Sequence, residues 1–147
     1  MALIADNAAD RVHQMLALTE QLTRLIEGET ELMRARRPLP EGPEADEKQR
    51  FVNIYRLEIA RIRDDASLIA SAPAALRGQL RSAGERLEAA LAAHATTLNA
   101  LKELTEGLVQ AMALEVVRIK AAGGAYGADG AAASASGPTP VALNQTA

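Results

Sequence analysis

The fold is decided by residues 74–122, which read AALRGQLRSAGERLEAALAAHATTLNALKELTEGLVQAMALEVVRIKAA. Two series of mostly apolar positions recur every seven residues in this stretch: Leu80, Leu87, His94, Leu101, Leu108 and Leu91, Leu98, Thr105, Met112, Ile119. Because an α-helix turns once in 3.6 residues, two interleaved series of this spacing keep an apolar stripe on one side of a helix. The segment predicts one long amphipathic helix, with Gly84 and Gly107 as candidate kinks.

Two further helical segments precede it. Residues 8–37 carry apolar positions alternately three and four residues apart, with Asp6 or Asn7 as the expected N-cap. That expected seam consists of Met15, Leu18, Leu22, Leu25, Glu29 and Leu32. Pro38, Pro40 and Pro43 then forbid helix, and a second helix is predicted over residues 44–70. Its expected seam consists of Val52, Tyr55, Ile59, Ile62, Ala66 and Ile69. Ser71-Ala72-Pro73 marks the break before the third helix.

Composition agrees with this reading. Hydrophobic residues make up 48% of the 147-residue chain, but aromatic residues only 2%, so the core must consist of aliphatic side chains that pack helix against helix. We predict an all-α fold, an antiparallel helical bundle or coiled coil of three long helices. Residues 1–122 are expected to form the bundle domain, and residues 123–147, rich in Gly, Ala, Ser and Pro, a flexible, disordered C-terminal tail.

The third helix is predicted to be much longer than its neighbours. At about 1.5 Å per residue the three helices measure roughly 45, 40 and 70 Å, so the first two cannot cover the third. The uncovered end is expected to expose Leu108, Val109, Met112, Leu114, Val116, Val117 and Ile119. Exposed apolar patches of this kind mark partner surfaces. The alternatives are a third helix that folds back at Gly84 or Gly107, and burial of this end in a homodimer.

Several classes of function find no support in the sequence. The chain has no cysteine, and its two histidines, His13 and His94, lie on different helices without the partners of a metal site, so we expect no metal, no cofactor and no enzyme activity. A net charge of −3 argues against nucleic-acid binding. The N-terminal residues lack a signal-peptide pattern and no apolar run is long enough for membrane insertion, so a cytoplasmic protein is expected.

Two segments resemble a known family. Glu47-Lys48 followed by Leu57-Glu58-Ile59-Ala60-Arg61, and Tyr126-Gly127-Ala128-Asp129-Gly130 after the long helix, are similar to the FlgN family of cytoplasmic chaperones for flagellar hook-filament junction proteins. The order of helices, Pro-rich turn and loose tail is similar too. The Ala-rich third helix and the tail with few charges depart from the family pattern.

The resemblance implies a bacterial type III flagellar export chaperone. Such a protein would bind the C-terminal region of unassembled hook-associated proteins and escort them to the cytoplasmic domain of the export gate. The client-binding residues would be Leu101, Leu108, Met112, Val116 and Ile119, and Tyr126 would dock to the gate. The competing hypothesis is a homodimeric structural coiled-coil adaptor that has no secreted client.

Overall fold

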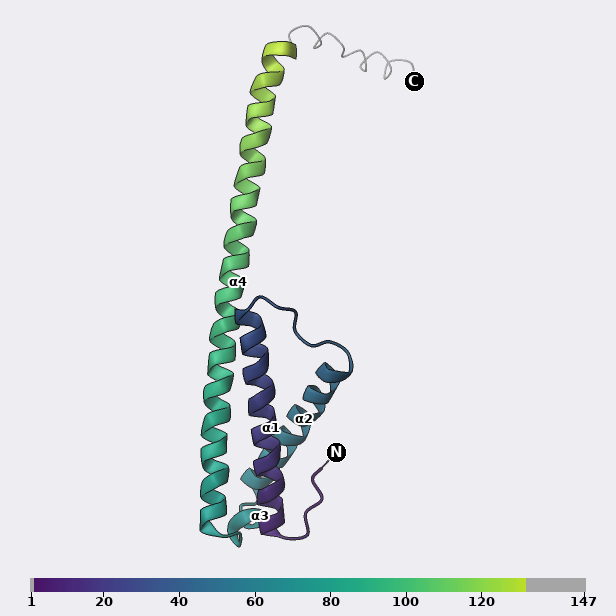
Figure 1. Cartoon of the computed structure of the whole chain (residues 1–147), viewed down its shortest axis with the longest axis vertical. Coiled ribbons are helices and arrows are strands. Elements are labelled where there is room, and N and C mark those ends of the chain that lie inside the picture. Colours follow the sequence, from purple (N-terminus) through teal and green to yellow (C-terminus); the bar gives the residue numbers. More distant parts are fainter. Residues whose placement is uncertain (1, 132–147) are drawn as a thin grey trace. The chain divides into compact units, whose positions relative to one another are not determined.

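The fold is all α-helical, as predicted. The computed structural model describes the backbone of residues 2–131 and the side chains of residues 2–123. Its helices are α1 (Ala8–Arg34), α2 (Pro43–Asp64), α3 (Ser67–Ala70) and α4 (Ala74–Ala131), and these described residues contain no strand (Figure 1). The three long helices are the ones expected, with a single short helical turn inserted before the last.

The first two long helices end earlier than predicted. α1 stops at Arg34 instead of Arg37, because Arg36 adopts a left-handed conformation with φ 54°. α2 stops at Asp64, and the Asp65 carboxylate accepts hydrogen bonds from the backbone N–H and the hydroxyl of Ser67 at 3.0 and 2.5 Å. These bonds lower the pKa of Asp65 and give the backbone an alternative to continued helix. At the other end of α1, Asn7 is confirmed as the N-cap and accepts from the Asp10 N–H at 2.9 Å.

The last helix extends further than predicted. α4 passes without interruption through Gly84 and Gly107, and it continues beyond the expected end at Ala122 as far as Ala131. Glycine lowers helix stability by about 1 kcal/mol relative to alanine, but it ends a helix only where it turns to the left-handed conformation. The predicted tail therefore begins as helix, and its remainder, residues 132–147, lies outside the described residues.

The chain divides into two units, Met1–Leu101 and Lys102–Ala147. The first contains α1, α2, α3 and the first part of α4, and ion pairs fix the direction of its helices. Arg11 pairs with Glu58 at 2.6 Å and Lys48 pairs with Glu29 at 2.6 Å, so α1 and α2 run antiparallel. Between α1 and α4, Glu20 lies 3.5 Å from Arg86 and Glu29 lies 3.3 Å from His94. Residue numbers increase in the same direction along both helices, so α1 and α4 run parallel (Figure 1). Consecutive long helices are antiparallel, as expected.

The buried side of α1 includes the predicted Met15, Leu18, Leu22 and Glu29, together with three threonines that were not expected, Thr19, Thr23 and Thr30. Part of this side follows an alternating three-and-four spacing: Val12, Met15, Thr19, Leu22, Ile26, Glu29 and Met33. The hydroxyl of Thr19 donates to the Met15 carbonyl oxygen at 2.7 Å, and Thr23 and Thr30 make the same bond to the carbonyl four residues before them. A threonine whose hydroxyl donates to its own helix can be buried without needing a hydrogen-bond partner on another helix. The predicted seam members Leu25 and Leu32 are only partly buried.

The core of the first unit lies between α1 and α4, with α2 laid over it. Met15, Leu22 and Ile26 of α1 pack with Leu87 and Ala90 of α4. The side of α4 that meets α1 includes small residues such as Ala83 and Ala90, which let two helices approach closely. The predicted second series does not share this side: Leu91 and Leu98 are 48% and 51% exposed.

Two buried carboxylates tie the helices of the first unit together. Glu58 of α2 is fully buried, and it accepts hydrogen bonds from Arg11, Arg61 and the backbone N–H of Leu3. Glu29 of α1 is 8% exposed and lies within 2.6 Å of Lys48 Nζ on α2 and 3.3 Å of His94 Nε2 on α4. Glu29, the acidic member of the predicted seam, is therefore a structural link between three helices.

The substitution Glu58→Ala tests the importance of this buried carboxylate. It removes three hydrogen bonds and leaves Arg11 largely buried without a partner, so the free energy of unfolding should fall by about 3 kcal/mol. Urea denaturation followed by circular dichroism measures this loss. Glu31→Ala is the matched control, because the Glu31 side chain is 71% exposed in its pair with Arg34, and it should cost less than about 0.5 kcal/mol. Equal losses in the two variants would contradict the assignment.

Candidate functional site: an uncovered apolar helix face

The second unit presents apolar side chains that no described residue covers. Every residue from 102 to 123 is exposed. Six large apolar residues of this segment, between 49% and 59% exposed, form what we call the apolar face: Leu104, Leu108, Val109, Met112, Val116 and Ile119. Exposed patches of this size on a soluble helix generally mark an interaction site.

The spacing of these residues places them on one side of α4. Leu104, Leu108 and Met112 are four residues apart, and Ile119 follows Met112 after seven. At about 100° per residue the six side chains fall within an arc of about 140°, and from Leu104 to Ile119 the face is about 24 Å long. This is the length of helix that a partner helix of four to five turns would cover.

The charges around the face balance. Lys102, Arg118 and Lys120 oppose Glu103, Glu106 and Glu115, so residues 102–123 carry no net charge. The guanidinium of Arg118 donates two hydrogen bonds to the Glu115 carboxylate, at 3.0 and 2.6 Å, and this contact raises the pKa of Arg118. A segment without net charge has no overall attraction for a polyanion, so apolar contact is the main source of recognition here.

The five predicted client-binding residues share one side of α4 by register. Leu108, Met112, Val116 and Ile119 belong to the apolar face. Leu101 lies seven residues before Leu108, where it is the last residue of the first unit and is partly buried. Their contact with a client stays a prediction.

The sequence analysis omitted Leu104, although its position four residues before Leu108 places both on the same side of a helix. Leu114 and Val117 are 73% and 64% exposed, as predicted, and by their register they lie on the side of α4 opposite the face.

Tyr126 lies in a different setting from the predicted one. It was expected in a loose tail after the helix, but its backbone belongs to α4. It follows Ile119 by seven residues, so it continues the heptad series of Met112 and Ile119. Its side chain is outside the part of the chain whose side chains are described, and its role in docking stays a prediction.

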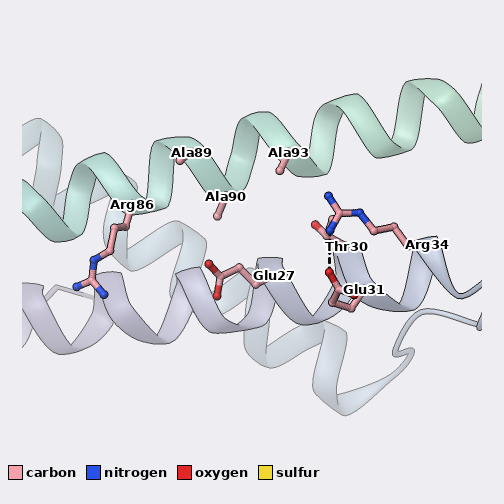
Figure 2. A pocket seen from close by; sticks show the side chains of 8 residues that line it. All are labelled: Glu27, Thr30, Glu31, Arg34, Arg86, Ala89, Ala90 and Ala93. Carbon is pink, nitrogen blue, oxygen red and sulfur yellow. Dashed lines mark hydrogen bonds and ion pairs between the residues drawn. The ribbon is translucent and has the colours of Figure 1, made fainter.

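A second surface feature is a groove in the first unit. Figure 2 shows it between α1 and α4, with a volume of about 500 Å³. It is lined by Glu27, Thr30, Glu31, Arg34, Arg86, Ala89, Ala90 and Ala93. Both cations of the groove have a carboxylate partner: Arg34 binds Glu31 at 2.7 Å, and Arg86 lies 3.5 Å from Glu20. The alanines on the α4 side offer no chemistry, so the groove is a packing gap between helices.

Within residues 2–131, no helix is both long enough and apolar enough to cross a lipid bilayer.

Two leucines of α4 test whether the apolar face supports the fold. Leu87 and Leu108 belong to the same heptad series, but Leu87 is 4% exposed and Leu108 is 55% exposed. Leu87→Ala should lower the free energy of unfolding by about 2 to 4 kcal/mol through the cavity it creates. Leu108→Ala should change it by less than about 0.5 kcal/mol. Urea denaturation of the monomer measures both, and a large loss in Leu108→Ala would show that the face is part of the core.

Comparisons with known proteins identify a relative. No model of a known protein family matches the sequence, so the resemblance to the FlgN family is not confirmed. No solved structure matches either. The chain is 40% identical over 131 residues to the flagellar basal-body protein FlbY of Caulobacter vibrioides, and the alignment covers 88% of each chain. Identity of this extent over nearly the whole length of both proteins shows common descent and a shared fold, and the chain therefore belongs to the family of FlbY.

Proposed function

We propose that this protein is a cytoplasmic chaperone of flagellar type III export. In this proposal it binds the C-terminal region of an unassembled hook-filament junction protein and escorts it to the export gate. The observation that carries the proposal is the apolar face of α4, which no described residue covers, in a protein whose relative is named for the flagellar basal body. The function is binding, without a chemical step.

The second unit has a physical need for a partner. Most of the stability of a protein helix comes from packing of its apolar face, since an isolated helix is marginal in water. Residues 102–123 include Gly107 and several β-branched residues, which have low helix propensity, and the ion pair between Glu115 and Arg118 is a weak support because both side chains are exposed. A bound segment would supply the missing packing.

The apolar face supplies part of the energy that a complex needs. Complete burial of a large aliphatic side chain contributes about 1.5 to 3 kcal/mol, and the residues of the face are already half-covered by their own helix, so about 1 kcal/mol each remains. Six residues then give about 6 kcal/mol before the cost of association is subtracted. This is less than the net gain of about 8 kcal/mol that micromolar affinity requires, so the client's own apolar side chains, buried in the same contact, have to supply the rest.

A client helix would benefit in the same way. A segment that later packs against its own copies in an assembled filament has an apolar face that must be shielded beforehand. An amphipathic helix docked lengthwise on the apolar face would be shielded, since helix-in-groove packing uses the same i, i+4, i+7 spacing on both partners. Shielding of the client thus needs no feature beyond the face itself.

The second candidate function is a homodimeric coiled-coil adaptor, and the strict heptad spacing of α4 favours it. In a parallel, in-register dimer the position after Met112 in the seam is Glu115, so two carboxylates would face each other. Like charges in a seam are destabilising, which makes a foreign partner the better reading. Multi-angle light scattering distinguishes the two: the chaperone is a monomer that forms a one-to-one complex, and the adaptor is a dimer at all concentrations tested.

The double variant Met112→Asp, Ile119→Asp tests the binding face. It places two carboxylates in the contact and should weaken binding of the junction protein's C-terminal region by at least about 100-fold, measured by isothermal titration calorimetry. Leu114→Asp, Val117→Asp is the matched control, because it adds the same charge on the opposite side of α4. Its affinity should stay within about threefold of the unchanged protein. Equal affinity in both double variants would exclude this face as the binding site.

Tyr126 is expected to contact the export gate. Tyr126→Ala should weaken binding to the purified cytoplasmic domain of the gate by about tenfold, since loss of an aromatic anchor costs more than 1 kcal/mol. Biolayer interferometry measures this affinity, and the helix content and client affinity of the variant should not change. A loss of helicity in Tyr126→Ala would show a structural role instead.

A further inference from the structure

The apolar face is wider than a single partner helix can cover. In the heptad of α4, Thr105, Leu108, Met112, Glu115 and Ile119 occupy the central seam. Large apolar side chains lie on both flanks of this seam, Val109 and Val116 on one side and Leu104 on the other, where the positions seven and fourteen residues later hold Ala111 and Arg118. The arc of about 140° is wider than the seam of a two-stranded coiled coil, which uses two positions in seven.

The residues on the flanks distinguish two kinds of assembly. In two-stranded coiled coils the flanking positions carry charges that pair across the helices and remain at the water boundary. In bundles at least one flank is apolar, because a second neighbour covers it. Val109, Val116 and Leu104 put large apolar groups on both flanks, so the helix has the pattern of a bundle member with two neighbours.

A second copy of this chain is a poor fit as the covering element. A parallel copy opposes Glu115 to Glu115 in the seam. An antiparallel copy centred on Met112 brings Glu115 against Val109 and buries its carboxylate beside an apolar group. In either arrangement one added helix leaves a flank exposed.

The charges beside the face indicate one chemical feature of the partner. Lys102 and Lys120 are 18 residues apart, a whole number of helical turns, so both border the flank of Val109 and Val116. Neither lysine forms an ion pair with any residue whose side chain is described. A helix packed on this flank would meet a lysine near each of its ends.

We propose that the apolar face receives a helical hairpin, two amphipathic helices of one partner chain, which together with α4 form a three-helix bundle. One helix packs on the flank of Val109 and Val116 and carries acidic residues about 27 Å apart that face Lys102 and Lys120. The other packs on the flank of Leu104. The inference rests on the proposed function, since the client supplies the hairpin.

Cysteine footprinting tests the hairpin directly. The chain has no cysteine, so single substitutions give one reactive thiol each. Leu108→Cys reports on the seam, Val109→Cys and Leu104→Cys on the two flanks, and Val117→Cys on the opposite side as the control. The alkylation rate with N-ethylmaleimide is measured with and without a saturating amount of the C-terminal region of a hook-filament junction protein from the same bacterium.

The outcomes separate the two proposals. Slowing of at least about tenfold at the seam and at both flanks, with no change at Val117→Cys, supports the hairpin. Slowing at the seam and one flank alone overturns the hairpin and leaves the chaperone function in place. No slowing at any position, under conditions where the junction protein binds, overturns this face as the client site. Slowing that appears without the junction protein as the protein concentration rises overturns the foreign partner in favour of a second copy.

Discussion

An apolar helix face has to be covered by another element, and this constraint governs the molecule. α4 carries apolar residues at heptad spacing along most of its 58 residues, whereas α1 and α2 have 27 and 22 residues. In the first unit, Leu76, Ala83, Leu87 and Ala90 of α4 are buried. From Lys102 onward the same helix continues and every described side chain is exposed. The same heptad pattern of α4 therefore has two consequences. Where α1 and α2 cover it, it forms the core of the fold, and where no described residue covers it, it forms the proposed binding site.

Buried ion pairs give the first unit its specificity. α2 has a single fully buried residue, Glu58, and its apolar residues, such as Phe51 and Ile59, are only partly buried. Apolar contact alone would hold such a helix loosely and in several registers. The pairs Glu58–Arg11 and Glu29–Lys48 connect opposite ends of α2 to α1, so only one antiparallel register satisfies both carboxylates.

The helices could be predicted well from the sequence, because apolar periodicity and the residues that begin or end a helix depend only on near neighbours in the chain. The prolines between α1 and α2, the Asn7 cap and the break before α4 are each decided by a few neighbouring residues. The side of each helix that is buried was harder to predict, because it depends on which other helix packs against it. Thr19 is buried beside the predicted Leu18 because its hydroxyl can bond to its own helix, and Leu91 is exposed because α1 meets a neighbouring side of α4. For the site, the heptad series placed the five expected contact residues on one side of α4, but it could not show that Leu101 is partly buried at the end of the first unit.

Hydrogen exchange of the isolated protein, read by mass spectrometry at low micromolar concentration, is the most direct test of the central claim. The claim is that residues 104–119 form a helix without a partner, whereas residues 80–90 of the same helix are packed. The account predicts that amides of residues 104–119 exchange at least about 100-fold faster than those of residues 80–90, since unsupported helices open readily. Equal protection of the two segments in a protein shown to be monomeric would contradict it.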